Sequence, residues 1–398
     1  MSAGPQAAPA RPSITSAAFW NDAGVRGVLY QVLLLGGIAA LAWYLLDNTM
    51  DNLAKARINT GFDYLGRESS FEIGESLIDY SAQNSYGRAI LVGLLNTLKV
   101  SVIGIVLATI LGTLLGIARL STNWLVARLA SVYVETIRNV PLLLQLFFWY
   151  ALISQVFPAP RQALNPIPGV FLSNRGLRVP VLADAPGYTY AGIAFLIGCV
   201  LTYLVHRWMK KRQMETGQPP RTLLPALGLM IGLPLIAWLA GGAPTALDMP
   251  QLQGFNFSGG TSLTPEFTAL LVGLIIYTAA FICEIVRSGI LGVNHGQTEA
   301  AKAVGLTPGQ TLRLVILPQA LRLIVPPMTS QYLNLTKNSS LAIAIGYPDL
   351  VAIANISINQ TGLAIENIAL IMAVYLTISL SISLFMNWYN ARIRLLER

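Results

Sequence analysis

Long runs of uncharged, apolar residues constrain this chain more than any other feature. Residues 27–46 contain no charged side chain, and comparable runs recur along the sequence. The hydrocarbon core of a bilayer is about 30 Å thick, so a helix needs about 20 residues to cross it. Backbone polar groups must be paired inside lipid, so such runs predict helices and an all-α, polytopic membrane protein. We count eight candidate spans, at 27–46, 89–118, 125–157, 188–206, 222–241, 266–288, 320–345 and 366–390.

The composition supports a membrane protein and argues against an ordinary soluble one. Charged residues make up 11% of the chain and apolar residues 54%, whereas soluble domains carry about 25% charged residues. The net charge of +8 does not indicate nucleic-acid binding. The basic residues are scattered between apolar runs and are not clustered with aromatic residues.

The placement of Lys and Arg predicts the orientation, because these residues collect in cytoplasmic loops. With both termini in the cytoplasm, sixteen of the 26 Lys and Arg residues lie inside and seven lie outside. We therefore expect a disordered cytoplasmic N-terminus at 1–26 and a cytoplasmic C-terminus at 391–398. The long loops at 47–87, 158–187 and 242–265 then face outside.

Residues suited to catalysis or metal binding are scarce. Cys199 and Cys283 lie in apolar runs and are expected to be small buried side chains, and only His206 and His295 could join them as metal ligands. The sequence contains no Gly-rich phosphate-binding loop with the Lys and hydroxyl that hold phosphates. We therefore expect that this chain does not hydrolyse ATP by the usual P-loop route, needs an ATPase partner, and has no cofactor or metal site of its own.

The loop between the sixth and seventh spans has a helical pattern. Residues 297–304 (QTEAAKAV) are good helix formers, and Gly305 can take the left-handed backbone that ends a helix. Thr307 can cap a second helix, with a proline at its first position and Gln310 at its third. We expect Pro318 to break the chain before the next span. The pattern predicts two short surface helices joined by a sharp turn; an ordinary amphipathic interfacial helix is the alternative.

The spacing of residues in this loop is specific. Glu299-Ala300-Ala301 is followed after three residues by Gly305, and after nine more by Val315-Ile316-Leu317-Pro318. This spacing resembles the EAA loop of bacterial ATP-binding-cassette (ABC) importer permeases, with Val315 in place of Ile. The resemblance implies a coupling helix that docks into a separate ATPase subunit. The residues implied in this coupling are Gln297, Glu299, Ala300, Ala301, Gly305, Leu317 and Pro318.

Flanking segments extend the resemblance. They read GLLNTL at 93–98, ETIR at 135–138, PLLLQLF at 141–147, TAAFICEIVRSG at 278–289 and KNSSL at 337–341. They are similar to permeases of polar amino-acid importers of the histidine, glutamine and arginine type, and most similar to the larger, Q-type permease of general L-amino-acid importers. Asn338 and Ser339 depart from the family's Asp and Thr, and Asn139-Val140 stands where Gly-Thr is common. These departures leave the substrate open.

The resemblance implies a type I ABC importer transmembrane domain with a five-helix core. The core would comprise residues 88–157 and 264–390, with the coupling loop at 296–318 inside its second part. Two segments lie outside the resemblance. They are an extra first span with a periplasmic loop at 27–87, and periplasmic loops with an extra helical hairpin at 158–263.

Arg138 is a candidate for a substrate pathway, because a charge within the membrane usually faces a cavity or a partner. Counting thirteen residues along its span places Arg138 about 20 Å deep, near mid-bilayer. A helix break is expected beside it, at Asn139 and Pro141. The guanidinium could hold a substrate carboxylate. Alternatively, it could pair with Glu135, three residues earlier on the same face.

For other polar residues within the spans, two roles are also open. Glu284 could line the pathway or pair with Arg287 at the membrane surface. Lys337 and Asn338 could line it or form a hydrogen-bonded subunit contact, and Lys99 is expected to extend toward lipid headgroups. The full predicted pathway set is Arg138, Asn139, Gln145, Thr278, Glu284, Lys337 and Asn338.

The resemblance also implies partners and a location. One five-helix core forms half a pore, so a second permease, expected to be distinct, would join it in the bacterial inner membrane. Two copies of an ABC ATPase would bind ATP and Mg, and a periplasmic amino-acid-binding protein would deliver L-amino acids for import. An ion-coupled secondary transporter or channel for amino acids is the alternative. A secondary transporter would need intramembrane acids, of which Glu284 is the only plausible one.

Overall fold

The structure, a computed structural model, describes residues 23–55, 61–216 and 223–393. The disorder predicted for 1–26 falls mostly on residues outside this description, and so does most of the predicted C-terminal segment 391–398. Residues 23–26 are helical and form the start of the first long helix, so for them the expectation of disorder is wrong.

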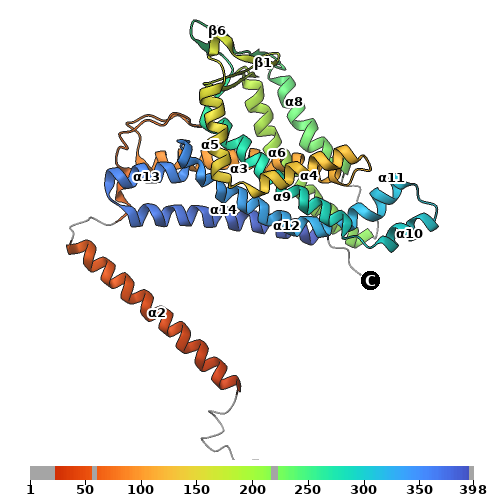
Figure 1. Ribbon diagram of the computed structural model, residues 1–398, viewed down its shortest axis with the longest axis horizontal. Helices are drawn as coiled ribbons and strands as arrows, with labels where there is room; N and C mark the ends of the chain where they lie inside the picture. Colours follow the sequence, from red (N-terminus) through yellow and green to blue (C-terminus); the bar gives the residue numbers. More distant parts are fainter. Residues whose placement is uncertain (1–22, 56–60, 217–222, 394–398) are drawn as a thin grey trace, which may run out of the picture.

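Helices form most of the described chain, which confirms the predicted all-α class (Figure 1). The longer ones are α2 (Ala23–Lys55), α3 (Tyr86–Arg119), α4 (Trp124–Asn139), α5 (Leu142–Ala151), α6 (Pro186–Thr216), α9 (Pro265–Leu291), α12 (Leu317–Asn338), α13 (Leu350–Thr361) and α14 (Ala364–Ile393). The shorter ones are α7 (Leu223–Leu227), α8 (Leu233–Ala240), α10 (His295–Ala303) and α11 (Pro308–Thr311). Single turns of 3-10 helix lie at Asp63–Gly66 and Pro160–Gln162, with a longer 3-10 segment at Ser339–Ile345; π-helical turns lie at Leu152–Val156, Gly228–Gly232 and Leu312–Ile316.

All eight predicted spans are helical, but two of them are not single long helices. Among the described residues, six helices are long and apolar enough to cross a membrane, or seven if a bent pair counts as one span. The bent pair is α4 with α5, whose axes differ by 103°. The predicted span 222–241 gives only the shorter apolar helix Leu224–Ala240. The expected count of eight is therefore too high for long, unbroken helices.

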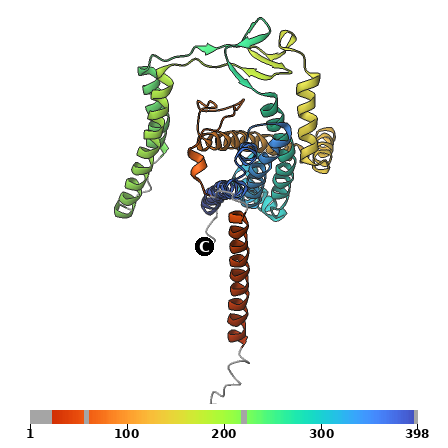
Figure 2. The same ribbon diagram turned by 90° about the vertical axis from the view of Figure 1, so that its left-hand side faces the viewer.

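The two outer loops predicted at 158–187 and 242–265 fold into short strands, which the apolar pattern did not reveal. Pairing is antiparallel throughout, in a four-stranded sheet of order β1-β2-β3-β8 and two further pairs, β4 with β5 and β6 with β7. Figure 2 shows that these strands connect the hairpin of α6 and α8 to the rest of the molecule. The strands are β1 (Leu164–Ile167), β2 (Val170–Ser173), β3 (Gly176–Val179), β4 (Val181–Leu182), β5 (Leu247–Asp248), β6 (Gln251–Gln253), β7 (Asn256–Ser258) and β8 (Thr261–Leu263).

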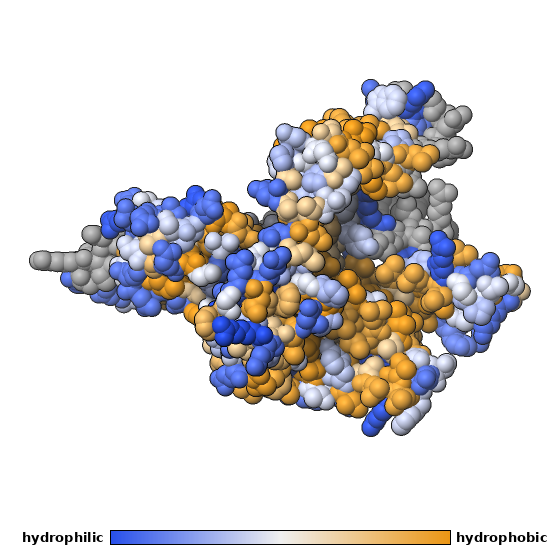
Figure 3. Space-filling model, turned by 90° about the horizontal axis from the view of Figure 1, so that it is seen from above, coloured by the Kyte–Doolittle hydropathy of each residue, from blue (hydrophilic) through white to orange (hydrophobic). Residues whose placement is uncertain are grey.

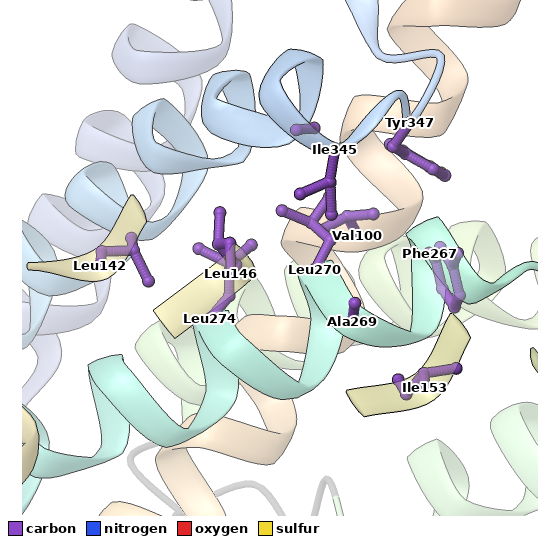
Figure 4. Packing of buried hydrophobic residues seen from close by; sticks show 11 residues of the cluster. Val100, Leu142, Leu146, Ile153, Phe267, Ala269, Leu270, Leu274, Ile345 and Tyr347 are labelled. Atoms are coloured by element: carbon purple, nitrogen blue, oxygen red, sulfur yellow. The ribbon is translucent and has the colours of Figure 1, made fainter. Parts of the chain in front are cut away.

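Helix α9 lies at the centre of the core. Its residues Phe267, Leu270 and Leu274 are fully buried and pack with Leu146 of α5 and Val100 of α3 (Figure 4). The 3-10 segment that follows α12 also contributes buried side chains to this cluster. On the face seen in Figure 3, apolar residues cover a broad central area, and hydrophilic residues gather mostly toward the ends. This distribution fits a body that lipid surrounds.

Helices α3 and α9 approach closely because glycines of α3 face α9. A β-carbon at Gly112 would lie 2.6 Å from the Ile282 side chain and 2.9 Å from the Ala279 carbonyl oxygen. One turn later, a β-carbon at Gly116 would lie 2.8 Å from Val286. Small residues spaced by four allow the backbones of membrane helices to come into contact. The glycines thus set the distance between the two helices.

We expect Gly112→Ala to destabilise the protein by about 1–3 kcal/mol, the usual cost of overpacking. Part of the clash is with backbone, which cannot rotate away. Gly104→Ala is the matched control, because its nearest neighbour is the mobile end of Leu335 at 3.3 Å. Thermal unfolding in detergent measures both variants. Equal melting temperatures for the two variants would contradict a rigid contact at Gly112.

The loop that precedes α3 is fastened to the core by Glu75. Its carboxylate forms an ion pair with Lys99 at 2.6 Å and accepts a hydrogen bond from the Thr264 hydroxyl at 2.7 Å. The Glu75 carbonyl accepts a further bond from the Asn96 amide at 2.8 Å. Both charged side chains are largely buried, at 9% and 17% exposed. Lys99 therefore points into the protein, and the expectation that it reaches lipid headgroups is wrong.

Candidate substrate pathway and coupling surface

The loop between α9 and α12 folds as its sequence predicts. The Asn294 side chain caps α10, and Gly305 ends the helix in the left-handed conformation, with φ of +81°. Thr307 then caps α11 in a reciprocal arrangement. Its hydroxyl accepts from the Gln310 backbone N–H at 3.4 Å, and the Gln310 side chain accepts from the Thr307 N–H at 2.9 Å. Pro308 is the first residue of α11. These helix ends of α10 and α11 are thus determined by residues close to them in the sequence.

Pro318 does not break the chain, contrary to expectation. A π-helical turn at Leu312–Ile316 joins α11 to α12, and Pro318 lies in the first turn of α12. A π turn widens the helix, so the missing N–H and the ring of the proline are tolerated where the hydrogen-bond pattern changes. The coupling loop therefore continues directly into the next span.

One face of this loop has no partner among the described residues. Ala301 is buried against the rest of the loop, at 4% exposed, whereas Ala300 and Gly305 are exposed and Val304 is 76% exposed. Glu299 pairs with His295 on the same helix, at 3.1 Å, and with no other residue that the structure describes. Helix α10 lies at one end of the molecule (Figure 1), and its exposed face, which carries Ala300 and Val304, is suited to enter a groove of another protein.

The predicted coupling residues divide between this face and the base of the loop. Gln297 accepts a hydrogen bond from Gln319 of α12 at 3.3 Å, which ties α10 to the next span. Leu317 is 43% exposed and Pro318 is half-buried. These three positions therefore lie at the junction between α10 and the start of α12.

The helix break expected at Asn139 and Pro141 is present, and Gln145 stabilises it. Helix α4 ends at Asn139 and α5 begins after Pro141. The buried Gln145 amide donates to the Ile137 carbonyl at 2.9 Å and to the Val140 carbonyl at 3.0 Å. These carbonyls belong to the segment that the bend disrupts. In this structure Gln145 holds the bend and does not line the pocket described next.

A polar pocket of about 450 Å³ lies between α3, α4 and α9. Three predicted pathway residues come together in it: Arg138, Asn139 and Glu284. Glu135, the alternative partner of Arg138, also lines it, as do Arg119, Val134 and Phe281. The remaining predicted residues do not. Thr278 is buried within α9, and Lys337 and Asn338 lie at the end of α12, where Lys337 is exposed.

Two of the charges in this pocket neutralise each other. Glu284 pairs with Arg119 of α3 and also with Arg287, at 2.9 Å, so the alternative expected for Glu284 is observed. Arg138 and Glu135 do not form an ion pair with each other or with any other described residue. The Arg138 guanidinium lies over the Phe281 ring, 5.0 Å from its centre. The pocket therefore presents one unpaired cation and one unpaired anion.

The structure places Arg138 at a different depth from the mid-bilayer position that was expected from counting residues along its span. Arg138 shares a pocket with Arg119, the last residue of α3, and with Glu284, which lies two turns before the end of α9. Since α4 and α5 are bent by 103°, distance along the chain does not measure depth. Arg138 lies toward the end of the bundle that carries α10, not halfway along α3 and α9.

Sequence reasoning missed Arg119 and Phe281 as pocket residues. Arg119 and Glu284 are 165 residues apart, and only the packing of α3 on α9 brings them together. The four-residue spacing of Gly112 and Gly116 is the one signal that could have revealed this contact, because such spacing marks a close helix pair.

Comparison with known proteins identifies the family. The family described as binding-protein-dependent transport system inner membrane component matches residues 222–395. The general L-amino acid transport system permease protein AapQ of Rhizobium johnstonii is 49% identical over 377 residues, which covers 95% of this chain and 94% of AapQ. This chain belongs to the ABC transporter permeases. The putative amino-acid ABC transporter permease protein YhdX of Escherichia coli is 48% identical over 98% of this chain and 99% of YhdX.

Family membership confirms the predicted class of function. A third relative of this permease, the glutamate/glutamine/aspartate/asparagine transport system permease protein BztB of Rhodobacter capsulatus, is 44% identical over 95% of the chain and 96% of BztB. An ABC permease is a membrane-embedded subunit, and ATP hydrolysis belongs to a separate ATPase subunit. The family also implies a binding-protein partner. The comparisons give no support to the alternative of a secondary transporter or channel.

Proposed function

We propose that this permease carries L-amino acids across the bacterial inner membrane into the cytoplasm. The observation that carries the proposal is the pocket with unpaired Arg138 and Glu135. An α-amino acid is a zwitterion, so its carboxylate matches the guanidinium and its ammonium matches the carboxylate. AapQ, YhdX and BztB are named as permeases for amino acids, which supports this substrate class.

Coupling to ATP hydrolysis would occur through the exposed face of α10. In this proposal the face formed by Ala300, Val304 and Gly305 enters a cleft of the ATPase, and Gln297 passes the movement to α12. ATP and Mg would be bound by the ATPase, so this chain needs no cofactor. Closure of the ATPases would pull on α10, and the helices that meet at the pocket would open alternately to the two sides.

The proposal places both termini and α10 in the cytoplasm. The excess of Lys and Arg in the corresponding loops supports this orientation. The strands β1–β8 and the loop that contains Glu75 would then face the periplasm, where a binding protein delivers its amino acid. The Lys337–Asn338 segment and Thr278 remain candidates for the part of the pathway that a second subunit completes.

We expect the second permease to be a different protein. The extra helix α2 and the hairpin of α6 and α8 make this chain longer than its five-helix core, and such additions distinguish one half of a pore from the other. The intact complex, purified from membranes by a tag on this chain, should have the mass of one copy of this chain, one different permease and two ATPases. A mass that fits two copies of this chain would contradict a mixed pair.

A further inference from the structure

Helix α2 is long and apolar, yet its most apolar stretch is not buried against any other described part of the chain. Its 33 residues extend away from the body, and none of its most apolar stretch is buried (Figure 1). Within its middle, Gly36 and Ala40 are four residues apart and lie on the same face. A face with small residues at this spacing is typical of a membrane helix that packs closely against another helix.

The chain immediately after α2 is fixed to the start of α14. The Gly61 N–H donates to the Glu366 carboxylate at 2.9 Å, and the Tyr64 hydroxyl donates to the Asn367 side chain at 3.0 Å. Glu366 and Asn367 are 8% and 0% exposed, so this attachment is part of the core. Only residues 56–60 separate α2 from Gly61, a reach of about 20 Å. The end of α2 must therefore stay near the start of α14.

A groove of about 550 Å³ runs beside α14, further along this helix than the attachment. Helices α3 and α14 form its walls, with one residue of α12, and nearly all of its surface is apolar. On α14 the small residues Ala373, Thr377 and Ser381 line the groove at four-residue spacing. The Thr377 and Ser381 hydroxyls donate to carbonyls of their own helix at 2.8 Å, so an apolar partner can cover them without cost.

One buried polar atom in the groove has no partner. Ser101 of α3 lines the groove and is 3% exposed, and its hydroxyl forms no hydrogen bond among the described residues. A buried hydroxyl without a partner is unfavourable. A helix that brings glycine against Ser101 would expose backbone carbonyls to it, because glycine has no side chain to cover them. Gly36 and Gly37 provide such a site on α2.

We propose that α2 folds back into this groove and packs antiparallel to α14, with Gly36 and Ala40 against Ser381 and Thr377. The attachment allows this register, since both helices rise about 1.5 Å per residue. Ala40 lies fifteen residues before Lys55, and Thr377 lies eleven after Glu366. The difference of about 6 Å is within the reach of residues 56–60. The occupant is the chain's own first span, covering α3 and α14 from lipid.

Paired cysteines test this placement in native membranes, with Cys199 and Cys283 replaced by alanine. One variant carries Ala40→Cys with Thr377→Cys, and a second carries Gly36→Cys with Ser381→Cys. The control carries Ile38→Cys with Thr377→Cys, because Ile38 lies about 200° around the helix from Ala40. A protease site within residues 56–60 separates α2 from the rest of the chain unless a short bis-maleimide has linked them.

We expect roughly fivefold more retained α2 in both test pairs than in the control, because opposite faces of a helix are about 10 Å apart. Equal retention in all three, or none in either test pair of a membrane-inserted chain, would overturn the proposal. A product heavier than one chain would also overturn it, since a second copy would then fill the groove. None of these outcomes depends on transport, so they do not bear on the proposed substrate.

Discussion

Ala300→Arg should abolish binding of the ATPase subunit. Ala300 lies on the exposed face of α10, beside Val304 and Gly305, and no described residue contacts this face closely enough to shield it. An arginine there would be buried in the ATPase cleft without a carboxylate arranged for it. Burying an unpaired charge at an interface costs about 2–5 kcal/mol, which weakens binding by roughly 30-fold or more. ATP-driven uptake should fall to background for the same reason.

Ala300→Ser is the matched control, because serine keeps the side chain small and uncharged. It should retain the ATPase and most of the uptake. Co-purification of the ATPase with a tagged permease, at constant permease yield, measures both variants. Full retention of the ATPase by Ala300→Arg would show that α10 is not the docking surface, whatever the similarity of its sequence to an EAA loop.

Arg138→Met should prevent amino-acid uptake while leaving the complex intact. Its guanidinium is the unpaired cation of the pocket and lies 5.0 Å from the Phe281 ring. Loss of a charged partner for a substrate carboxylate costs about 2–5 kcal/mol, so the KM for uptake should rise at least about 30-fold. Arg138→Lys should recover only part of the lost affinity for the substrate, since an ammonium cannot make the two parallel hydrogen bonds of a guanidinium.

Arg128→Met provides the control for Arg138. Arg128 is exposed on the same helix and does not line the pocket, so its loss should leave KM unchanged. Uptake kinetics in vesicles, with ATPase binding measured in parallel, separate an effect on substrate from an effect on assembly. A normal KM for Arg138→Met would remove this residue from the substrate pathway.

The parts of the structure that were predictable from sequence depend on local chemistry. Apolar length predicts the helices, and Thr307 with Gln310 predicts the cap of α11, because each needs only residues close in sequence. Gly305 has the predicted left-handed conformation, and the helix breaks at Pro141 as expected. The resemblance carried by Glu299 to Pro318 predicted the family, which the comparisons confirm.

The parts that were not predictable depend on contacts between distant residues. Strand β3 is paired with β8, more than 80 residues away, and neither strand is long enough to show a pattern alone. Lys99 meets Glu75 and Arg119 meets Glu284 only after the helices pack. The position of the bend between α4 and α5, at Pro141, could be predicted, but the angle of the bend could not. Because the span was taken as straight, Arg138 was predicted at the wrong depth. The prediction that Pro318 breaks the chain was wrong because a π-helical turn precedes it, and such a turn has no clear sequence signal.

The central claim is that this permease moves amino acids only when a partner hydrolyses ATP. The direct measurement is uptake of a radiolabelled amino acid into proteoliposomes that contain the purified complex, with binding protein added outside and ATP enclosed. Uptake should require both the ATPase subunits and hydrolysable ATP, and an ion gradient should not replace them. Uptake by the permease pair alone, driven by a proton or sodium gradient, would contradict the account.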